Sequence, residues 1–175
     1  STTYPFSLLL FPLFSSPSAS PLSLLPLRFL RAAGLEWVRV NSDGPTVEAV
    51  PQDQLQNKAD RLYVQEALRL KPGECYVSPI DLNVEFDRIQ VPYEPVMRVA
   101  TPVWFNNEVR GVLVLNESPA GLLDRVHRVR DGKLLFANGE GAYMHHPDAA
   151  RCWGPQLGHD GNVFKGWPWL LSTSD

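Results

Sequence analysis

Several polar side chains recur inside otherwise apolar segments between residues 53 and 116, and together they could bind a small polar molecule. An arginine guanidinium can hold a carboxylate through two parallel hydrogen bonds. Tyrosine and other hydroxyl groups add apolar walls and hydrogen bonds, and an aspartate can accept from an ammonium group. A few polar groups among apolar ones are typical of ligand sites. The candidate ligand-binding residues are Arg61, Tyr63, Tyr76, Ser78, Asp81, Arg98 and Thr101.

The two arginines in this set each have a structural alternative. Arg61 can pair with Asp81 or Glu85 and so hold a helix on a sheet instead of contacting a ligand. Arg98 lies in an apolar strand, where a buried guanidinium requires a partner. That partner can be a ligand or the loop formed by residues 83–95. The sequence leaves both alternatives open.

Metal binding and catalysis find less support. His145 and His146 are adjacent, with Asp148 nearby, but neighbouring side chains of a strand point to opposite faces and do not readily chelate one ion. Ser78 lacks a Gly-x-Ser-x-Gly elbow and is followed by a proline. No phosphate loop or dinucleotide fingerprint occurs. We therefore expect no metal, no cofactor and no catalytic residue.

The candidate residues fall on a predicted helix, on the strand that follows it and on the first strand of a later hairpin. Leu55 to Leu70 has apolar residues at helical spacing, with Asp53 as a candidate N-cap and Pro72–Gly73 as the stop. Residues 74–82 alternate as a strand does, although Pro79 predicts an edge or a bulge. The helix is therefore expected to present Arg61 and Tyr63 to a sheet.

The next two predicted strands form the strongest hairpin in the chain. They span residues 96–105 and 109–116, and Asn106-Asn107-Glu108 joins them. Asparagine tolerates the positive φ that tight hairpin turns require. Upstream, residues 27–41 predict a further strand pair with a turn at Ala33–Gly34. In its second strand, alternation would place Trp37, Arg39 and Asn41 on one face.

Composition limits the class of protein. The chain has 175 residues, of which 44% are hydrophobic, and a net charge of −3, so a nucleic-acid-binding surface is not indicated. Sixteen prolines and twelve glycines favour short strands and loops over a helical bundle. Cys75 and Cys152 are too few for a disulfide framework; they are either unpaired apolar residues or, in an exported domain, one disulfide.

The first 27 residues contain no charged side chain and are interrupted by five prolines. A membrane-spanning helix requires about 20 mostly apolar residues, and a signal peptide requires a basic start. We therefore expect residues 1–27 to be a poorly ordered leader, with the remnant of an anchor or of a long helix as the alternative. After residue 116, a connector over 117–131 precedes a weaker unit with a predicted hairpin turn at Asn138–Gly139.

Five segments in order carry a family resemblance. They are GLEWVRVN, LQNKADRLYVQEALRL, GECYVSPIDLNVE, PVMRVATPVWFNNEVRGVLVLN and GEGAYMHHPDAARCWG. Over roughly residues 28–170 the chain resembles the extracytoplasmic double Cache (PAS-like) sensor domains of bacterial histidine kinases, diguanylate cyclases and chemoreceptors. The resemblance implies an α+β fold with a PAS-like antiparallel sheet and a packed helix at 28–116. It also implies part of a second, smaller PAS-like unit at 132–175.

The resemblance also implies a function. The chain would be a ligand-sensing, non-enzymatic fragment of a periplasmic receptor domain, binding an amino acid or organic acid in the membrane-distal unit and biasing a cytoplasmic output. The full-length receptor could be a homodimer, and it would meet the membrane only through segments absent here. The alternative is a secreted or surface binding module without a small-molecule pocket, in which Arg61 and Asp81 merely pair.

Overall fold

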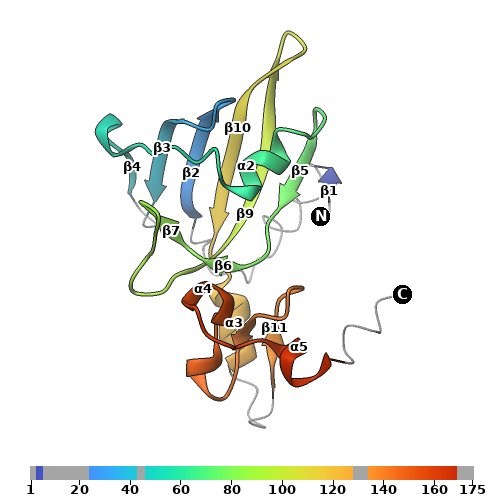
Figure 1. Ribbon diagram of the computed structural model, residues 1–175. Coiled ribbons are helices and arrows are strands. Elements are labelled where there is room, and N and C mark those ends of the chain that lie inside the picture. Colours follow the sequence, from blue (N-terminus) through green and yellow to red (C-terminus); the bar gives the residue numbers. More distant parts are fainter. Residues whose placement is uncertain (1–2, 6–23, 43–45, 128–133, 169–175) are drawn as a thin grey trace. The chain divides into compact units, whose positions relative to one another are not determined.

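A computed structural model describes residues 3–5, 24–42, 46–127 and 134–168 (Figure 1). The chain forms two compact units. The first comprises residues 1–78 and 96–118, and the second comprises residues 79–95 and 119–175. The sequence-based division kept residues 79–95 with the first unit.

The first unit is built on an antiparallel sheet, which confirms the predicted α+β class. The neighbours in the sheet follow the order β1-β5-β9-β10-β2-β3-β4. Figure 1 shows the long β9–β10 hairpin extending beyond the other strands of this unit. The strands are β1 (Thr3–Pro5), β2 (Leu24–Arg31), β3 (Glu36–Ser42), β4 (Val47–Ala49), β5 (Glu74–Val77), β9 (Pro95–Phe105) and β10 (Glu108–Glu117).

The β9–β10 hairpin closes through the predicted asparagines. Asn106 and Asn107 have φ values of 50° and 60°, as a tight hairpin turn requires. The turn between β2 and β3 is also confirmed: Gly34 has a φ of 80°, and a Cβ at this position would lie 2.4 Å from the Cα of Ala59. Glycine is therefore required there for both conformation and space.

The helix that covers the sheet is shorter than predicted. Helix α2 spans Leu62–Ala67, and Arg61 is its N-cap, whereas Asp53 lies in the short 3-10 helix η1 (Gln52–Gln54). The residues between are extended because their backbone pairs with the turn and start of β3: the Glu36 amide donates to the Gln56 carbonyl, and the Lys58 amide donates to the Gly34 carbonyl. Cross-strand hydrogen bonds thus override the helical spacing of this segment.

The core of the first unit lies between α2 and one face of the sheet (Figure 1). Leu30 of β2, Ala100 of β9 and Val112 and Val114 of β10 point toward the helix, and Tyr76 of β5 joins them. Helix α2 contributes Tyr63, Val64 and Ala67. A six-residue helix is not stable alone, so this packing holds α2 in place.

The predicted alternation in β3 is wrong at one point. A register shift occurs where Phe29 and Leu30 of β2 pair with Val38 and Glu36, so Trp37 is the extra residue. Trp37 is exposed whereas Arg39 is buried, and the two do not share an environment. A β-bulge of this kind interrupts the two-residue period and cannot be read from apolar alternation alone.

The predicted strand at 74–82 is two separate strands. Strand β5 ends at Val77, and β6 (Asp81–Leu82) lies in the second unit. Most of the predicted leader lies outside the described residues. Its described parts lie in strands: β1 pairs with β5, and β2 already begins at Leu24. The expectation of poor order for residues 1–27 stays a prediction.

The second unit contains short elements. Strands β7 (Val84–Glu85) and β8 (Arg88–Ile89) pair, and β11 (Phe136–Ala137) pairs with β12 (Tyr143–His145) around the predicted Asn138 turn. Leu82, Leu123, Met144 and Trp153 form the core. The Gln156 side chain clamps β6 by bonding both the Leu82 amide and carbonyl. The helical elements are α3 (Ala120–His127), η2 (Ala149–Arg151), α4 (Gly154–Leu157) and α5 (Val163–Gly166).

Candidate functional site

Arg98, Tyr63 and Ser78 meet on the helix-covered face of the first unit. The Arg98 guanidinium carbon lies 5.2 Å from the centre of the Tyr63 ring, so the strand and α2 are joined by a cation–π contact. The Arg98 amide donates to Ser78 Oγ at 2.9 Å, and the Ser78 amide donates to the Arg98 carbonyl at 2.8 Å. Arg98 is only 5% exposed. The sequence placed these three residues in one site, and the structure brings them together.

Tyr76 and Arg61 lie at the borders of this group. Tyr76 is the cross-strand partner of Ala100, and its side chain is part of the apolar core with Tyr63. Arg61 precedes α2, and its Nε lies 3.7 Å from the Asp60 carboxylate. The Arg61 side chain is 25% exposed. It is therefore less buried than Arg98 and better placed to meet solvent or an incoming molecule.

Thr101 and Asp81 do not join the group around Arg98. Thr101 is three residues from Arg98 in a regular strand, so the two side chains point to opposite faces. The Thr101 hydroxyl donates to the Glu74 carbonyl at 2.8 Å and so supports the β5–β9 pairing. Asp81 belongs to β6 in the second unit. The proposal below therefore uses neither residue.

A buried charge cluster in β2 and β3 was not predicted. The Glu36 side chain is fully buried; it forms an ion pair with Arg28 at 3.1 Å and accepts a hydrogen bond from Arg39 at 3.4 Å. Its second oxygen also accepts from the Gln56 amide, while Arg39 donates to the Gln54 carbonyl. The cluster thus fastens the extended segment before α2 to the sheet. In a regular strand Glu36 and Arg39 would face opposite sides of the sheet, so the sequence did not predict that they meet. The bulge at Trp37 brings them to the same side.

Two polar residues near the end of β10 were also missed. Asn116 is 2% exposed, and Glu117 next to it is partly buried. Burial raises the pKa of the Glu117 carboxyl above its usual value, because the charged form loses solvation. Both follow a long apolar run, and a polar pair at the end of such a run reads equally well as the start of a loop.

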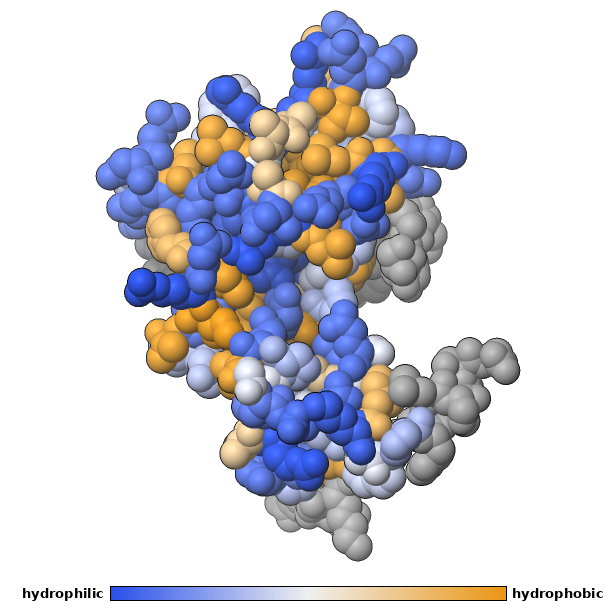
Figure 2. All heavy atoms as spheres, in the orientation of Figure 1, coloured by the Kyte–Doolittle hydropathy of each residue, from blue (hydrophilic) through white to orange (hydrophobic). Residues whose placement is uncertain are grey.

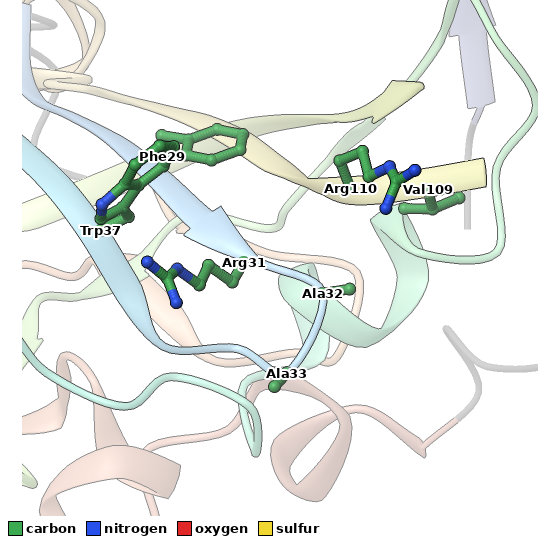
Figure 3. A pocket seen from close by; sticks show the side chains of 7 residues that line it. All are labelled: Phe29, Arg31, Ala32, Ala33, Trp37, Val109 and Arg110. Atoms are coloured by element: carbon green, nitrogen blue, oxygen red, sulfur yellow. The ribbon is translucent and has the colours of Figure 1, made fainter. Parts of the chain in front are cut away.

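A groove of about 430 Å³ lies on the first unit around the β2–β3 turn (Figure 3). It is lined by Phe29, Arg31, Ala32, Ala33, Trp37, Val109 and Arg110. Arg31 lies 5.1 Å from the centre of the Trp37 ring, which is itself 5.8 Å from that of Phe29. Phe29 and Arg31 alternate with the core residue Leu30, so this groove is on the face opposite α2. It holds none of the predicted site residues.

Figure 2 shows hydrophobic residues interspersed with hydrophilic ones on the visible face. Among the residues that the structure describes, no three His, Cys, Asp or Glu side chains are grouped to hold a metal ion. His146 instead packs its ring edge-on against Tyr143, 4.9 Å between centres, and accepts from the Asp148 amide.

Both cysteines are free thiols. Cys75 is buried, and Cys152 is partly buried. Burial and, to a smaller extent, the Asp148 charge raise the pKa of the Cys152 thiol. A hydrogen bond from the His146 backbone lowers this pKa, but burial is the largest effect. A thiol with a raised pKa is a weak nucleophile at neutral pH. Cys152 therefore does not have the properties of a reactive cysteine.

Comparisons with known proteins give a consistent result. The model of the family described as bacterial histidine kinase, sensor domain, matches residues 23–164. The extracellular domain of vpHK1S-Z8, described as a histidine kinase, is 27% identical, with a TM-score of 0.64 over 85% of this chain. A domain of a sensory box/GGDEF family protein from Vibrio parahaemolyticus is 26% identical, with a TM-score of 0.67 over 95% of the chain.

These two structures are longer than the present chain, which covers 55% and 64% of them. The ligand-binding domain of the Campylobacter jejuni chemoreceptor Tlp3, in complex with 4-methylisoleucine, is 16% identical. The matched region covers 65% of this chain and 40% of the Tlp3 domain. The TM-score of 0.46 is too low to bear on the present ligand. No curated protein sequence matches the chain. In the described part of the chain, no helix is long and apolar enough to cross a membrane.

Proposed function

The chain belongs to the family of bacterial histidine kinase sensor domains, and from this we propose that its first unit detects a small carboxylate, an amino acid or an organic acid, between α2 and the sheet. The chain is an extracytoplasmic sensing domain rather than a catalytic one, as the likeness to the extracellular domain of vpHK1S-Z8 also indicates. In this proposal the first unit is membrane-distal and the second is membrane-proximal. The cytoplasmic output and a homodimeric receptor belong to the proposal as well.

Arg98 carries the proposal. It is a buried guanidinium on β9; its backbone amide bonds Ser78, the residue after β5, and its side chain contacts Tyr63 of α2. An arginine fork matches a carboxylate in a way that a lysine ammonium does not. In this proposal Arg98 holds the ligand carboxylate, Tyr63 and Tyr76 form apolar walls, Ser78 fixes the strand position of Arg98, and Arg61 attracts the anion at the start of α2.

The position of α2 explains how binding could be transmitted. A ligand changes a conformational equilibrium only if it binds one state better than the other. Tyr63 is on α2 and stacks with Arg98 of the sheet. A carboxylate that engages the guanidinium alters this contact, and α2 then docks differently in the bound and free states. The proposed signal is this change in docking.

The test compares two matched arginine variants in a thermal-shift screen of amino acids and organic acids. Ligand at about 100 times its dissociation constant should stabilise the parent by about 2.7 kcal/mol. Arg98→Lys keeps the charge but removes the fork, so it should lose most of that response. Arg110→Lys makes the same change at an exposed residue of β10 and should leave the response intact.

Two results would count against the proposal. One is a screen in which no carboxylate changes the melting temperature of the parent. The other is an Arg98→Lys protein that remains folded and responds as the parent does. Arg61→Ala tests the second arginine: loss of its charge should weaken carboxylate binding and reduce the salt dependence of that binding. The effect on the fold should be small, because the Arg61–Asp60 pair is in contact with solvent.

A further inference from the structure

Asn116 has a buried side-chain acceptor near the end of β10. Its Oδ1 is buried and accepts no hydrogen bond from any described residue. Leaving a buried polar atom unsatisfied costs roughly 1–3 kcal/mol. Buried side-chain acceptors in native proteins are therefore nearly always paired, with protein, water or ligand. The Asn116 amide thus indicates a donor that is not among the described residues.

Asn116 is placed beside the proposed carboxylate clamp. It is the Cα partner of Arg98 across β10 and β9, and such partners lie about 4.5–5.5 Å apart. It alternates with Val112 and Val114, which face α2, and is therefore on the same face as Arg98. One small molecule can reach both side chains if its carboxylate and its donor are on neighbouring atoms.

The charges buried in this unit indicate which kind of donor fits. Among its described residues, the buried charged side chains are four cations and one anion: Arg28, Arg39, Lys58, Arg98 and Glu36. An ammonium buried here would lie close to the Arg98 guanidinium and would lose its hydration. A hydroxyl donates without adding charge and without the desolvation cost of a cation.

We propose that the ligand is a hydroxycarboxylate, with its carboxylate on Arg98 and the adjacent hydroxyl donating to Asn116 Oδ1. This inference rests on the proposed function and narrows the ligand from amino or organic acids to acids that carry a neutral donor. It also assigns a binding role to Asn116. The simpler alternative is that a permanently bound water satisfies Asn116, in which case the amide has no influence on ligand choice.

Two series of compounds test the inference by calorimetric titration of the full chain. Each series keeps the carbon skeleton and changes one group: succinate, malate and aspartate, and propionate, lactate and alanine. The hydroxy acid should bind roughly tenfold tighter than the unsubstituted acid, the value of one hydrogen bond to a buried acceptor. The amino acid should bind more weakly than the hydroxy acid in both series.

Two Asn116 variants assign any preference to this residue. Asn116→Leu has a similar size and no acceptor, so the hydroxy and unsubstituted acids should bind equally. Asn116→Asp supplies a carboxylate, which favours an ammonium, so the amino acids should gain relative to the hydroxy acids. Asn41→Asp adds the same charge at an exposed residue of β3 and should leave the order of affinities unchanged.

The outcomes separate this inference from the proposed function. If none of the six compounds binds, the carboxylate site itself is refuted, and the inference with it. If carboxylates bind but the hydroxy acids have no advantage, or the amino acids bind best, only the inference is refuted. A hydroxy-acid preference that persists in Asn116→Leu assigns the donor to another residue and also overturns it. Should Asn116→Leu not fold, the switch expected in Asn116→Asp decides.

Discussion

Neutralising Glu36 should strongly destabilise the first unit. Glu36 is the one acid among the buried charged side chains described in that unit, and both its oxygens are used: Arg28 binds one at 3.1 Å, and Arg39 and the Gln56 amide bind the other at 3.4 and 2.9 Å. Glu36→Gln keeps the size of the side chain and removes the charge. Arg28 and Arg39, which are cross-strand partners, then face each other without the Glu36 charge between them.

The magnitude follows from the burial of the cluster. Removing one partner of a buried ion pair costs about 3–5 kcal/mol, because the remaining charge is left without compensation. For a unit of roughly 100 residues, each kcal/mol lowers the melting temperature by about 4–8 °C. The loss should therefore exceed about 10 °C, and urea unfolding followed by circular dichroism should show a lower midpoint. Glu48→Gln, an exposed acid on β4, should change stability by less than about 0.5 kcal/mol.

A second substitution tests the cause of the loss. If excess buried positive charge is responsible, adding Arg39→Met to Glu36→Gln should recover part of the stability, because one of the two opposed cations is removed. Arg39→Met alone should be destabilising, since the Gln54 carbonyl and the Glu36 carboxylate each lose their contact with Arg39. A Glu36→Gln protein as stable as Glu48→Gln, or a double variant that shows only the sum of the two losses, would refute this account of the cluster.

Two further predictions concern the turn and the end of β10. Gly34→Ala should be more destabilising than Gly73→Ala, because both glycines have φ near 80° but only Gly34 lies against Ala59. The urea midpoints of the two variants measure the difference. Equal losses of stability would contradict the steric argument and leave only the cost of the left-handed conformation, about 1–2 kcal/mol. Burial raises the pKa of Glu117 above 4.5 in the folded state, so the folded protein keeps this proton to a higher pH than the unfolded chain does. The free energy of unfolding should therefore fall as the pH rises from about 4.5 through the raised pKa. Glu117→Gln should remove this part of the decline in a series of melting curves, and a series identical to that of the parent would contradict the assignment.

Much of the fold could be predicted because local signals agreed with it. The Asn106–Asn107 turn, the apolar runs of β9 and β10 and the Gly34 turn each specify a structure through their own residues. The helix before β5 was predicted too long because its first half has helical spacing but forms backbone hydrogen bonds with β3. Spacing reports which side chains face one direction, and it contains no information about a distant strand that competes for the same amides.

The candidate site was predictable in part for a related reason. Arg98 and Tyr63 could be identified because each is a polar or aromatic residue in a segment otherwise built for burial. Thr101 was included on the same reasoning, but it faces away from Arg98, because the face of a residue depends on the strand register. Asn116 was missed because a polar residue at the end of an apolar run has no distinct pattern. Only the pairing of β10 with β9 identifies it as the neighbour of Arg98.

The shortness of α2 connects the fold with the proposed sensing role. An isolated six-residue helix is unstable in water, so α2 depends on Tyr63, Val64 and Ala67 being buried against the sheet. Arg98 touches one of these three residues. A ligand on Arg98 therefore acts on about a third of the side chains that hold the helix, and a change of a few kcal/mol in that contact is enough to change which docked state is populated. A longer, self-supporting helix would be less sensitive to the same event.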